Sequence, residues 1–245
     1  MKKSVIIVGG GFAGLELIKR IGNSPRYDTI LVDANNYNFF PPLIYQVSTG
    51  FMEPSAISYP FRKILRNLKN TRFRLGSLIK VVPSENKIIL SNGELHYDIL
   101  VMATGTESSF FGNKNIEKYS LPMKTISDAL TLRNTILTRL DRATRQDDQE
   151  ERKRLLTFVI AGAGPTGVEL SGILAEMKSS IIKKDYPELK ESDLGKIYLI
   201  DGQNTVLNTM SINSQTYTHA KLNELGVEIK LNCLVKDFKD DIVLL

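Results

Sequence analysis

Ser4-Val5-Ile6-Ile7-Val8-Gly9-Gly10-Gly11-Phe12-Ala13-Gly14 is the part of the sequence that most strongly indicates the fold of this chain. A short apolar run typical of a strand leads into the spacing G-x-G-x-x-G, and a helical pattern follows as far as Ile21. The same order returns much later as Thr157-Phe158-Val159-Ile160-Ala161-Gly162-Ala163-Gly164-Pro165-Thr166-Gly167. The separation far exceeds the period of a solenoid repeat, so the two copies predict two nucleotide-binding units.

Each glycine of the first copy has a predicted task. Gly9 allows a tight turn, Gly11 lets a pyrophosphate approach the backbone, and Gly14 lets the helix pack closely on the strand. The N-terminus of the helix adds unpaired amides and a partial positive charge. An acid should end the next strand to hold the ribose hydroxyls, and Asp33 stands there. Strand, turn, helix and acid together predict a dinucleotide site.

The second copy carries Gly162, Gly164 and Gly167, and Asp201 ends the next apolar run. A carboxylate at Asp201 would repel a 2′-phosphate, and no arginine follows it in the turn Asp201-Gly202-Gln203-Asn204. This chemistry favours NAD(H) over NADP(H). Two dinucleotide sites in one chain indicate electron transfer between two cofactors, with a nicotinamide as donor and a flavin as the usual acceptor.

Strands that alternate with helices predict an α/β protein of two Rossmann-like, doubly wound units. We place the domain boundary near Leu121-Pro122, between a first part over residues 1–122 and a second over 123–245. The expected strands cover residues 29–33, 73–82, 87–90, 99–102, 157–161, 196–201 and 227–231; the expected helices cover 13–21, 61–68, 127–142, 166–178 and 215–225. Residues 37–51 are expected to form an aromatic loop and 146–154 a charged connector.

The composition excludes several classes of protein. Of 245 residues, 42% are hydrophobic and 24% charged, which is ordinary for a globular chain and argues against disorder. One cysteine, Cys233, excludes a disulfide framework, a zinc cluster and a dithiol pair within the chain, and we expect no metal site. The uncharged stretch 34–52 holds prolines and amides that no lipid-facing helix tolerates, and the apolar run 5–8 is too short for a secretory signal. We therefore expect a cytoplasmic chain.

The residues resemble a known family, the type II NADH dehydrogenases (NADH:quinone oxidoreductases) of the pyridine nucleotide-disulfide oxidoreductase-like flavoproteins. The glycine turns and Ala103-Thr104-Gly105 mark this superfamily of two-dinucleotide-binding-domain proteins. Two stretches are more specific: Phe40-Pro41-Pro42-Leu43-Ile44-Tyr45-Gln46-Val47-Ser48-Thr49-Gly50 and Pro165-Thr166-Gly167-Val168-Glu169-Leu170. Disulfide reductases and sulfide:quinone reductases of the superfamily need cysteines that the loop 35–50 lacks.

The resemblance implies a non-covalent FAD on residues 1–122, NADH on residues 123–245 and a quinone as final electron acceptor. The residues that it implies for the ADP half of FAD are Gly9, Gly11, Phe12, Ala13, Gly14 and Asp33, with the backbone around Leu78 against the adenine. Those implied for the rest of the flavin are Ala103, Thr104 and Gly105 at the diphosphate side and Pro42, Leu43 and Gln46 at the ring, Gln46 with a catalytic role beside the quinone. Those implied for NADH are Gly162, Gly164, Pro165, Thr166, Gly167 and Asp201.

Two features have two interpretations each. Glu169 is either an acid favoured in the first turn of a helix or, as the resemblance supports, a catalytic carboxylate near the contact of nicotinamide and flavin. Glu16 holds the parallel position in the first copy. The basic run from Phe61 to Arg74 is either a solvated face or a surface attracted to anionic lipid. No nucleic-acid recognition motif accompanies this charge, so we expect no nucleic-acid partner.

The resemblance also implies how the parent protein continues, where it is located and how it associates. Members of the family continue beyond the NAD unit, so we expect this chain to be an N-terminal portion, with the C-terminal part of the family fold missing. We expect the parent to be peripheral on the cytoplasmic face of the inner membrane, and the exposed apolar surface to allow a homodimer. Three functions stay open: an NADH:quinone oxidoreductase, a soluble NADH-dependent reductase of a ferredoxin- or rubredoxin-like protein, and a dinucleotide-binding module without turnover.

Overall fold

The computed structural model describes the backbone of residues 1–245 and the side chains of residues 1–180, 182 and 184–245. The chain forms two compact units: unit 1 comprises Met1–Pro41 and Pro54–Glu107, and unit 2 comprises Pro42–Glu53 and Ser108–Leu245. The elements of unit 1 are β1 (Lys3–Val8), α1 (Phe12–Ile21), β2 (Tyr27–Asp33), β3 (Tyr37–Phe39), α3 (Pro54–Ile57), β4 (Ser58–Pro60), α4 (Phe61–Leu65), β5 (Thr71–Leu75), β6 (Leu78–Val82), η2 (Pro83–Glu85), β7 (Lys87–Leu90), β8 (Gly93–His96) and β9 (Ile99–Met102).

The short helix η1 (Pro41–Leu43) leads from unit 1 into unit 2. The elements of unit 2 are α2 (Ile44–Ser48), α5 (Lys114–Tyr119), α6 (Ile126–Thr144), α7 (Gln149–Leu155), β10 (Phe158–Ala161), α8 (Pro165–Met177), η3 (Lys178–Ile182), α9 (Lys183–Asp185), η4 (Glu191–Asp193), β11 (Ile197–Ile200), α10 (Ile212–Glu224), β12 (Val227–Lys230), β13 (Asp237–Lys239) and β14 (Ile242–Leu244).

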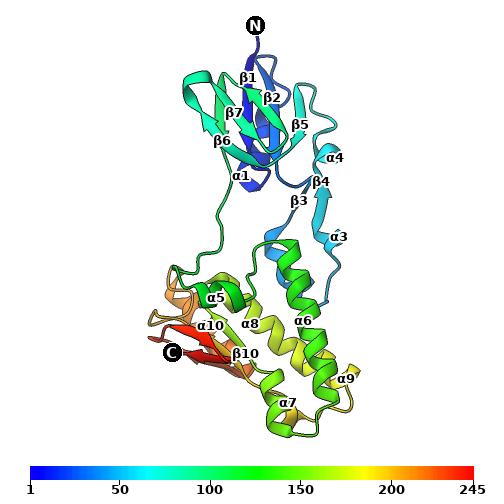
Figure 1. Cartoon of the computed structure of the whole chain (residues 1–245), viewed down its shortest axis with the longest axis vertical. Coiled ribbons are helices and arrows are strands. Elements are labelled where there is room, and N and C mark those ends of the chain that lie inside the picture. The colour runs from blue at the N-terminus through cyan, green and yellow to red at the C-terminus, as the bar shows by residue number, and fades with distance from the viewer. The chain divides into compact units, whose positions relative to one another are not determined.

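The main sheet of unit 1 is parallel, in the order β5-β2-β1-β9. Figure 1 labels its strands β5, β2 and β1. In its register Val8 pairs with Val32 on one side and with Met102 on the other. The three strands therefore end together, and Gly9, Asp33 and Ala103 leave the sheet at the same edge. Open α/β sheets bind their ligands at this carboxyl edge.

The two faces of this sheet are covered differently. Helices α1 and α4 pack on one face, where Phe61 is 1% exposed and its ring stacks on Phe73 with centroids 5.1 Å apart. The antiparallel sheet β6-β7-β8 covers the other face, and Ile88 and Leu90 of β7 pack against Ile6 there. The α/β Rossmann-like class is confirmed, with strands rather than a helix as the second cover in unit 1.

Unit 2 repeats the arrangement with a parallel sheet in the order β10-β11-β12. Ala161 pairs with Ile200, so Gly162 and Asp201 also leave their strands at one edge. Helices α6, α7, α8 and α10 contribute to the core around this sheet. The most deeply buried residues of that core are Leu140, Ala143, Leu199 and Val206.

Some expected elements are wrong in detail. The expected strand 73–82 is two strands, because β5 pairs with β2 while the chain turns at Gly76 and β6 pairs with β7. The expected loop 37–51 contains β3 and α2, and the expected connector 146–154 contains α7. Helix α7 buries only Leu155 among its seven residues, so its sequence carries no apolar stripe that periodicity could detect. Strand β8, helix α5 and the hairpin β13-β14 were also not expected from the sequence.

The compact units divide the chain at positions other than Leu121-Pro122. Helix α5 belongs to unit 2, since Asn113 Nδ2 donates to Lys236 O at 2.7 Å and the Tyr119 ring lies 5.9 Å from that of Phe238. The segment Pro42–Glu53 belongs to unit 2 as well. The limits 1–122 and 123–245 describe which part holds which cofactor, and that assignment stays a prediction.

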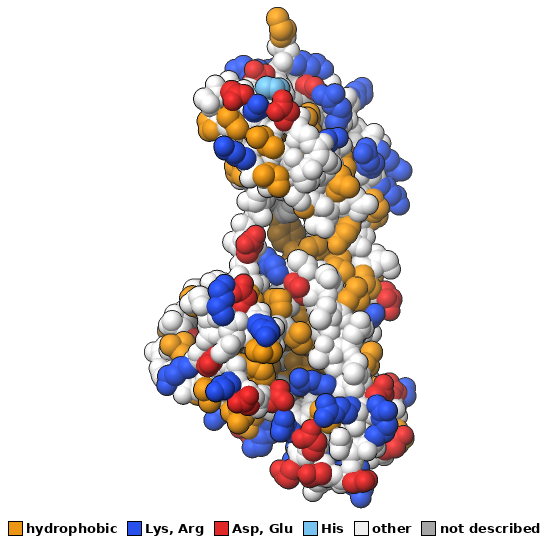
Figure 2. All heavy atoms as spheres, viewed as in Figure 1, with side chains coloured by type: hydrophobic (Ala, Val, Ile, Leu, Met, Phe, Trp, Pro, Cys, Tyr) orange, Lys and Arg blue, Asp and Glu red, His pale blue; other side chains and the backbone are white. Residues whose placement is uncertain are grey.

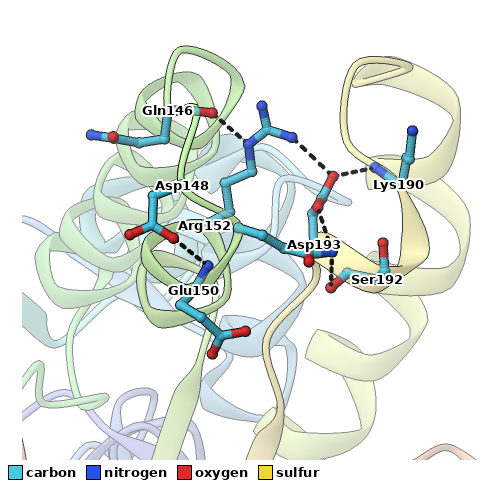
Figure 3. A network of polar contacts seen from close by, with 8 residues as sticks. Gln146, Asp148, Glu150, Arg152, Lys190, Ser192 and Asp193 are labelled. Carbon is cyan, nitrogen blue, oxygen red and sulfur yellow. Dashed lines mark hydrogen bonds and ion pairs between the residues drawn. The ribbon is translucent and has the colours of Figure 1, made fainter.

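A polar network around Asp193 connects the segment between α8 and β11 to helix α7 (Figure 3). Asp193, 3% exposed, accepts hydrogen bonds from Lys190 N at 2.9 Å, Arg152 Nη1 at 3.2 Å and Gln149 Nε2 at 3.3 Å. Arg152 Nε in turn donates to Gln146 O at 2.6 Å. The hydrogen bond from the Lys190 backbone, helped by the Arg152 guanidinium, holds the pKa of Asp193 below its ordinary value although burial raises it.

Candidate functional site

The glycine turns of the two units have the same backbone conformation. Gly9 has φ +105° and Gly162 has φ +101°, a region of backbone conformation that residues with a Cβ atom rarely adopt. A Cβ on Gly14 would overlap the carbonyl oxygen of Gly9, and a Cβ on Gly167 would overlap that of Gly162. The first and third glycines are therefore required by conformation and by packing within each unit, as the sequence predicted.

The middle glycines have a different environment. Gly11 is the N-cap of α1 and Gly164 the N-cap of α8, and a Cβ on either would meet nothing within 4 Å. Within the described residues, no side-chain oxygen caps either helix. Both turns thus present helix-terminal amides to open space, which suits an anion such as a pyrophosphate.

An acid fixes each turn in the same way. Asp33 Oδ2 accepts from Gly10 N at 2.7 Å and Oδ1 from Asn35 N at 2.8 Å. Asp201 Oδ2 accepts from Ala163 N at 2.5 Å and Oδ1 from Gln203 N at 2.7 Å. Each carboxylate is held by two backbone N–H groups beside its glycine turn, where a ribose would lie in a dinucleotide complex. Cys233 is half-buried, and its N–H donates to Asp201 O at 3.0 Å.

Unit 1 has a small cleft of about 90 Å³ at its glycine turn. The residues that line it are Gly10, Gly11, Phe12, Asp33, Asn35, Tyr37, Asn38, Phe39, Pro41 and Phe61. Phe12 is 61% exposed, and its ring lies edge-on to that of Phe40 with centroids 5.8 Å apart. Asn38, which the sequence did not single out, donates from Nδ2 to Gly10 O at 2.9 Å and helps to fix the turn.

A larger open hollow of about 690 Å³ lies elsewhere in unit 1. Lys3, Arg26, Tyr27 and Ile99 line it, at the ends where β1, β2 and β9 begin. Dinucleotides bind where parallel strands end, not where they begin. The smaller cleft is therefore the candidate site, because it contains the glycine turn and Asp33.

The other residues expected at the flavin fall into two places. Ala103, Thr104 and Gly105 follow β9, and a Cβ on Gly9 would collide with Ala103 O, so this turn lies against the glycine turn. Gly105 has φ +75° and open space around it. Leu78 begins β6, is half-buried in the apolar cluster with Ile88, and does not line the cleft.

Pro42, Leu43 and Gln46 belong to unit 2. Helix α2 packs on α6 and α8. Gln46 Oε1 is buried and has no hydrogen-bond partner among the described residues. The neighbouring Tyr45 donates from its hydroxyl to Thr166 Oγ1 at 3.2 Å, a contact with the second glycine motif that was not expected from the sequence.

Glu169 lies outside the first turn of α8. The helix begins at Pro165, a residue favoured at this position, so Glu169 is its fifth residue, and it is exposed. The expectation of a first-turn acid is wrong, and the interpretation that rested on the helix terminus loses its physical basis. Glu16, in the parallel position of α1, pairs with Arg20 at 2.8 Å.

Several basic side chains of the run from Phe61 to Arg74 form ion pairs or cation–π contacts with neighbouring residues of unit 1. Arg72 pairs with Asp28 at 2.6 Å, the Arg62 guanidinium lies 5.5 Å from the centre of the Phe73 ring, and Lys63 lies 4.8 Å from that of Tyr59. Lys and Arg side chains gather on one side of unit 1, over the region of α4 and β5 (Figure 2). Surface pairs of this kind contribute little to stability.

Comparison with known proteins agrees with this geometry. The chain is 36% identical over 239 residues to the type II NADH:quinone oxidoreductase Ndh of Mycobacterium tuberculosis, covering 95% of this chain and 51% of that protein. It is 29% identical to the external alternative NAD(P)H-ubiquinone oxidoreductase B4 of Arabidopsis thaliana, covering 96% of this chain and 42% of that protein. The structure of NDH2 from Plasmodium falciparum in complex with NADH matches with TM-score 0.88 and 26% identity, over 98% of this chain and 50% of that one.

The chain thus spans about half the length of the curated relatives it matches. The family model described as pyridine nucleotide-disulphide oxidoreductase matches residues 3–244, which takes in both glycine turns, both acids and the segment between them. The chain belongs to the pyridine nucleotide-disulphide oxidoreductase family.

Proposed function

We propose that the protein carrying this chain is a non-proton-pumping NADH dehydrogenase that passes electrons from NADH through FAD to a quinone. The observation that carries the proposal is the pair of glycine turns, each with an acid held by two backbone N–H groups at the carboxyl edge of a parallel sheet. A bound flavin supplies two-electron uptake from a nicotinamide and release to a quinone. The names of the M. tuberculosis and P. falciparum relatives support the assignment.

Unit 1 would hold FAD and unit 2 would hold NADH. The residues we assign to FAD are Gly9, Gly11, Phe12, Ala13, Gly14 and Asp33, with Leu78 near the adenine and Ala103, Thr104 and Gly105 along the diphosphate side. Those assigned to NADH are Gly162, Gly164, Pro165, Thr166, Gly167 and Asp201. The open space at Gly11 and Gly164 fits a pyrophosphate at each turn, which supports both assignments.

Glu169 and Gln46 are the candidates for catalytic roles. Glu169 is an exposed carboxylate two residues beyond Gly167, in the second turn of α8, and we assign it to the nicotinamide end of the site. Gln46, with Pro42 and Leu43, is assigned to the flavin ring and the quinone. Its buried amide oxygen has no partner among the described side chains and backbone, which leaves it an acceptor to offer.

The test uses the complete gene product loaded with FAD. Mixing with NADH should bleach the flavin absorbance within one turnover, and a soluble quinone should restore it. Glu169→Gln should keep its flavin content and slow flavin reduction by about a hundredfold or more, the scale of a lost acid–base group. Reoxidation by a ferredoxin- or rubredoxin-like protein but not by quinone would instead support a soluble reductase. A protein that binds both dinucleotides without any flavin reduction would be a binding module.

The specificity for NADH rests on the charge of Asp201. Asp201→Asn removes the repulsion of a 2′-phosphate, so the affinity for NADPH relative to NADH should rise at least about fivefold, as ~1 kcal/mol of charge repulsion gives. The ratio of the two dissociation constants is the measurement, because a general loss of folding affects both ligands. Asp33→Asn makes the same change in unit 1 and should leave the ratio unaltered. A wild-type chain that binds NADPH as tightly as NADH would contradict the assignment.

The partners and location of the whole protein are part of the proposal. Among the described residues, no helix is both long and apolar enough to cross a membrane. We assign the protein to the cytoplasmic face of the inner membrane, where a quinone is reached from the membrane surface, and the basic side of unit 1 would favour anionic lipid. A homodimer is proposed as well, and sedimentation of the complete gene product tests it.

A further inference from the structure

The segment Pro42–Glu53 lies between strands of unit 1 in the sequence but folds onto unit 2. Ile44 and Val47 are 3% and 0% exposed, and helix α2 packs on α6 and α8. Arg133 of α6 pairs with Glu53 at 3.6 Å at the far end of the segment. The segment Pro42–Glu53 is therefore an integral, packed part of unit 2, which carries the second glycine turn.

This packing places Tyr45 beside that turn with its backbone fixed. The carbonyl oxygen of Tyr45 accepts from Ser48 Oγ at 2.7 Å and from Thr49 Oγ1 at 3.0 Å, and both of these residues are buried. The tyrosine hydroxyl donates to Thr166 Oγ1 at 3.2 Å. Thr166 is exposed and is the second residue of α8, inside the stretch Gly164-Pro165-Thr166-Gly167.

The two glycine turns differ in their supply of hydrogen-bond donors at this point. Helix α1 begins with Phe12 and Ala13, whose backbones both carry an N–H group. Helix α8 begins with Pro165, which has none, so its first turn offers one amide fewer to an anion. Thr166 takes the place of Ala13 and adds a hydroxyl. Because a hydroxyl has one hydrogen, accepting from Tyr45 leaves the hydrogen of Thr166 free to donate elsewhere.

We propose that Tyr45 is a positioning residue for NADH: its hydroxyl holds Thr166 so that the threonine hydroxyl donates to the pyrophosphate of the nucleotide in place of the amide that Pro165 lacks. The inference rests on the proposed binding of NADH to unit 2 and names a residue for it from a distant part of the sequence. The segment Pro42-Leu43-Ile44-Tyr45-Gln46 would thereby contribute to the nucleotide site of unit 2.

The test measures the binding of NADH, ADP-ribose and adenosine to the chain and its variants. Tyr45→Phe and Thr166→Val should each weaken NADH and ADP-ribose about three- to tenfold, the value of one hydrogen bond. The double variant should be no weaker than the weaker single variant, because both changes remove one shared interaction. Adenosine, which has no phosphate, should bind to the wild type and to these variants with equal affinity. Thr166→Ser keeps the hydroxyl, so this variant should bind NADH as tightly as the wild type does.

Tyr217→Phe is the matched control, since Tyr217 is 71% exposed on α10 of the same unit, and it should change nothing. The role of Tyr45 is overturned if Tyr45→Phe binds NADH as the wild type does, if the two losses add in the double variant, or if adenosine weakens equally. A wild-type chain that binds no NADH at all would overturn the proposed function, and this role with it. The two failures are therefore distinguishable.

Discussion

Gly167→Ala is expected to weaken NADH binding by about a hundredfold or more and to destabilise unit 2 by roughly 3 kcal/mol, the upper range for overpacking. The added Cβ would overlap Gly162 O and lie 3.3 Å from Ile160 Cγ2. These neighbours are backbone and a core side chain, so helix α8 must move away from β10. The amides at the start of α8 would then leave the position that a pyrophosphate requires. Thermal unfolding and NADH titration measure the two effects.

The same helix provides the control. Gly172 also lies in α8, and a Cβ there would meet nothing within 4 Å. Gly172→Ala should therefore stabilise the chain by roughly 0.5–1 kcal/mol through helix propensity and leave NADH binding unchanged. Equal effects of the two substitutions, or wild-type binding by Gly167→Ala, would show that the close contact of helix and turn is not required.

Asp193→Asn is expected to lower the melting temperature of the chain more than any other single carboxylate-to-amide change in unit 2 outside the glycine site. The side chain is 3% exposed and accepts from a backbone amide, an arginine and a glutamine. An amide in its place keeps the volume but turns one acceptor into a donor that faces other donors. Buried groups left without partners are among the established causes of large destabilisation.

The control for this change is Asp241→Asn. Asp241 pairs with Arg154 of the same helix α7 at 3.0 Å, but both side chains are more than half exposed. Exposed pairs are screened by water, so this variant should melt close to the wild type. If the two variants melt at the same temperature, the network around Asp193 in Figure 3 does not stabilise the packing of the segment between α8 and β11 on α7.

The same carboxylate gives a pH dependence of known sign. The pKa of Asp193 is lowered in the folded chain, chiefly by the hydrogen bond from the Lys190 backbone. The unfolded chain therefore binds the proton more readily, and the stabilisation is complete above the ordinary aspartate value of about 3.9. It is lost as the pH falls from there toward the lowered pKa. The stability difference between wild type and Asp193→Asn should accordingly be constant near neutral pH and shrink below about pH 4. A difference that stays constant down to pH 2 would contradict this origin.

The glycine turns and the acids beside them can be predicted from the amino-acid sequence alone. Their positions could be predicted because each follows from local geometry: a positive φ at Gly9 and Gly162, a close helix contact at Gly14 and Gly167, and an acid at the end of the next strand. Parallel register then brings the strand ends together without further information. The α/β class and the strands nearest the turns follow for the same reason, since buried parallel strands are read directly as apolar runs.

The parts of the chain that complete these turns are identified by tertiary contacts. Asn38 reaches Gly10 and Tyr45 reaches Thr166 through contacts between residues far apart in the sequence, and no local pattern records such pairs. The short helices α2 and α7 bury only a few residues each, so their own periodicity is too weak to reveal them. The partition of the chain, with Pro42–Glu53 on unit 2, is likewise a result of packing against α6 and α8, because burial of Ile44 and Val47 depends on surfaces that other segments supply.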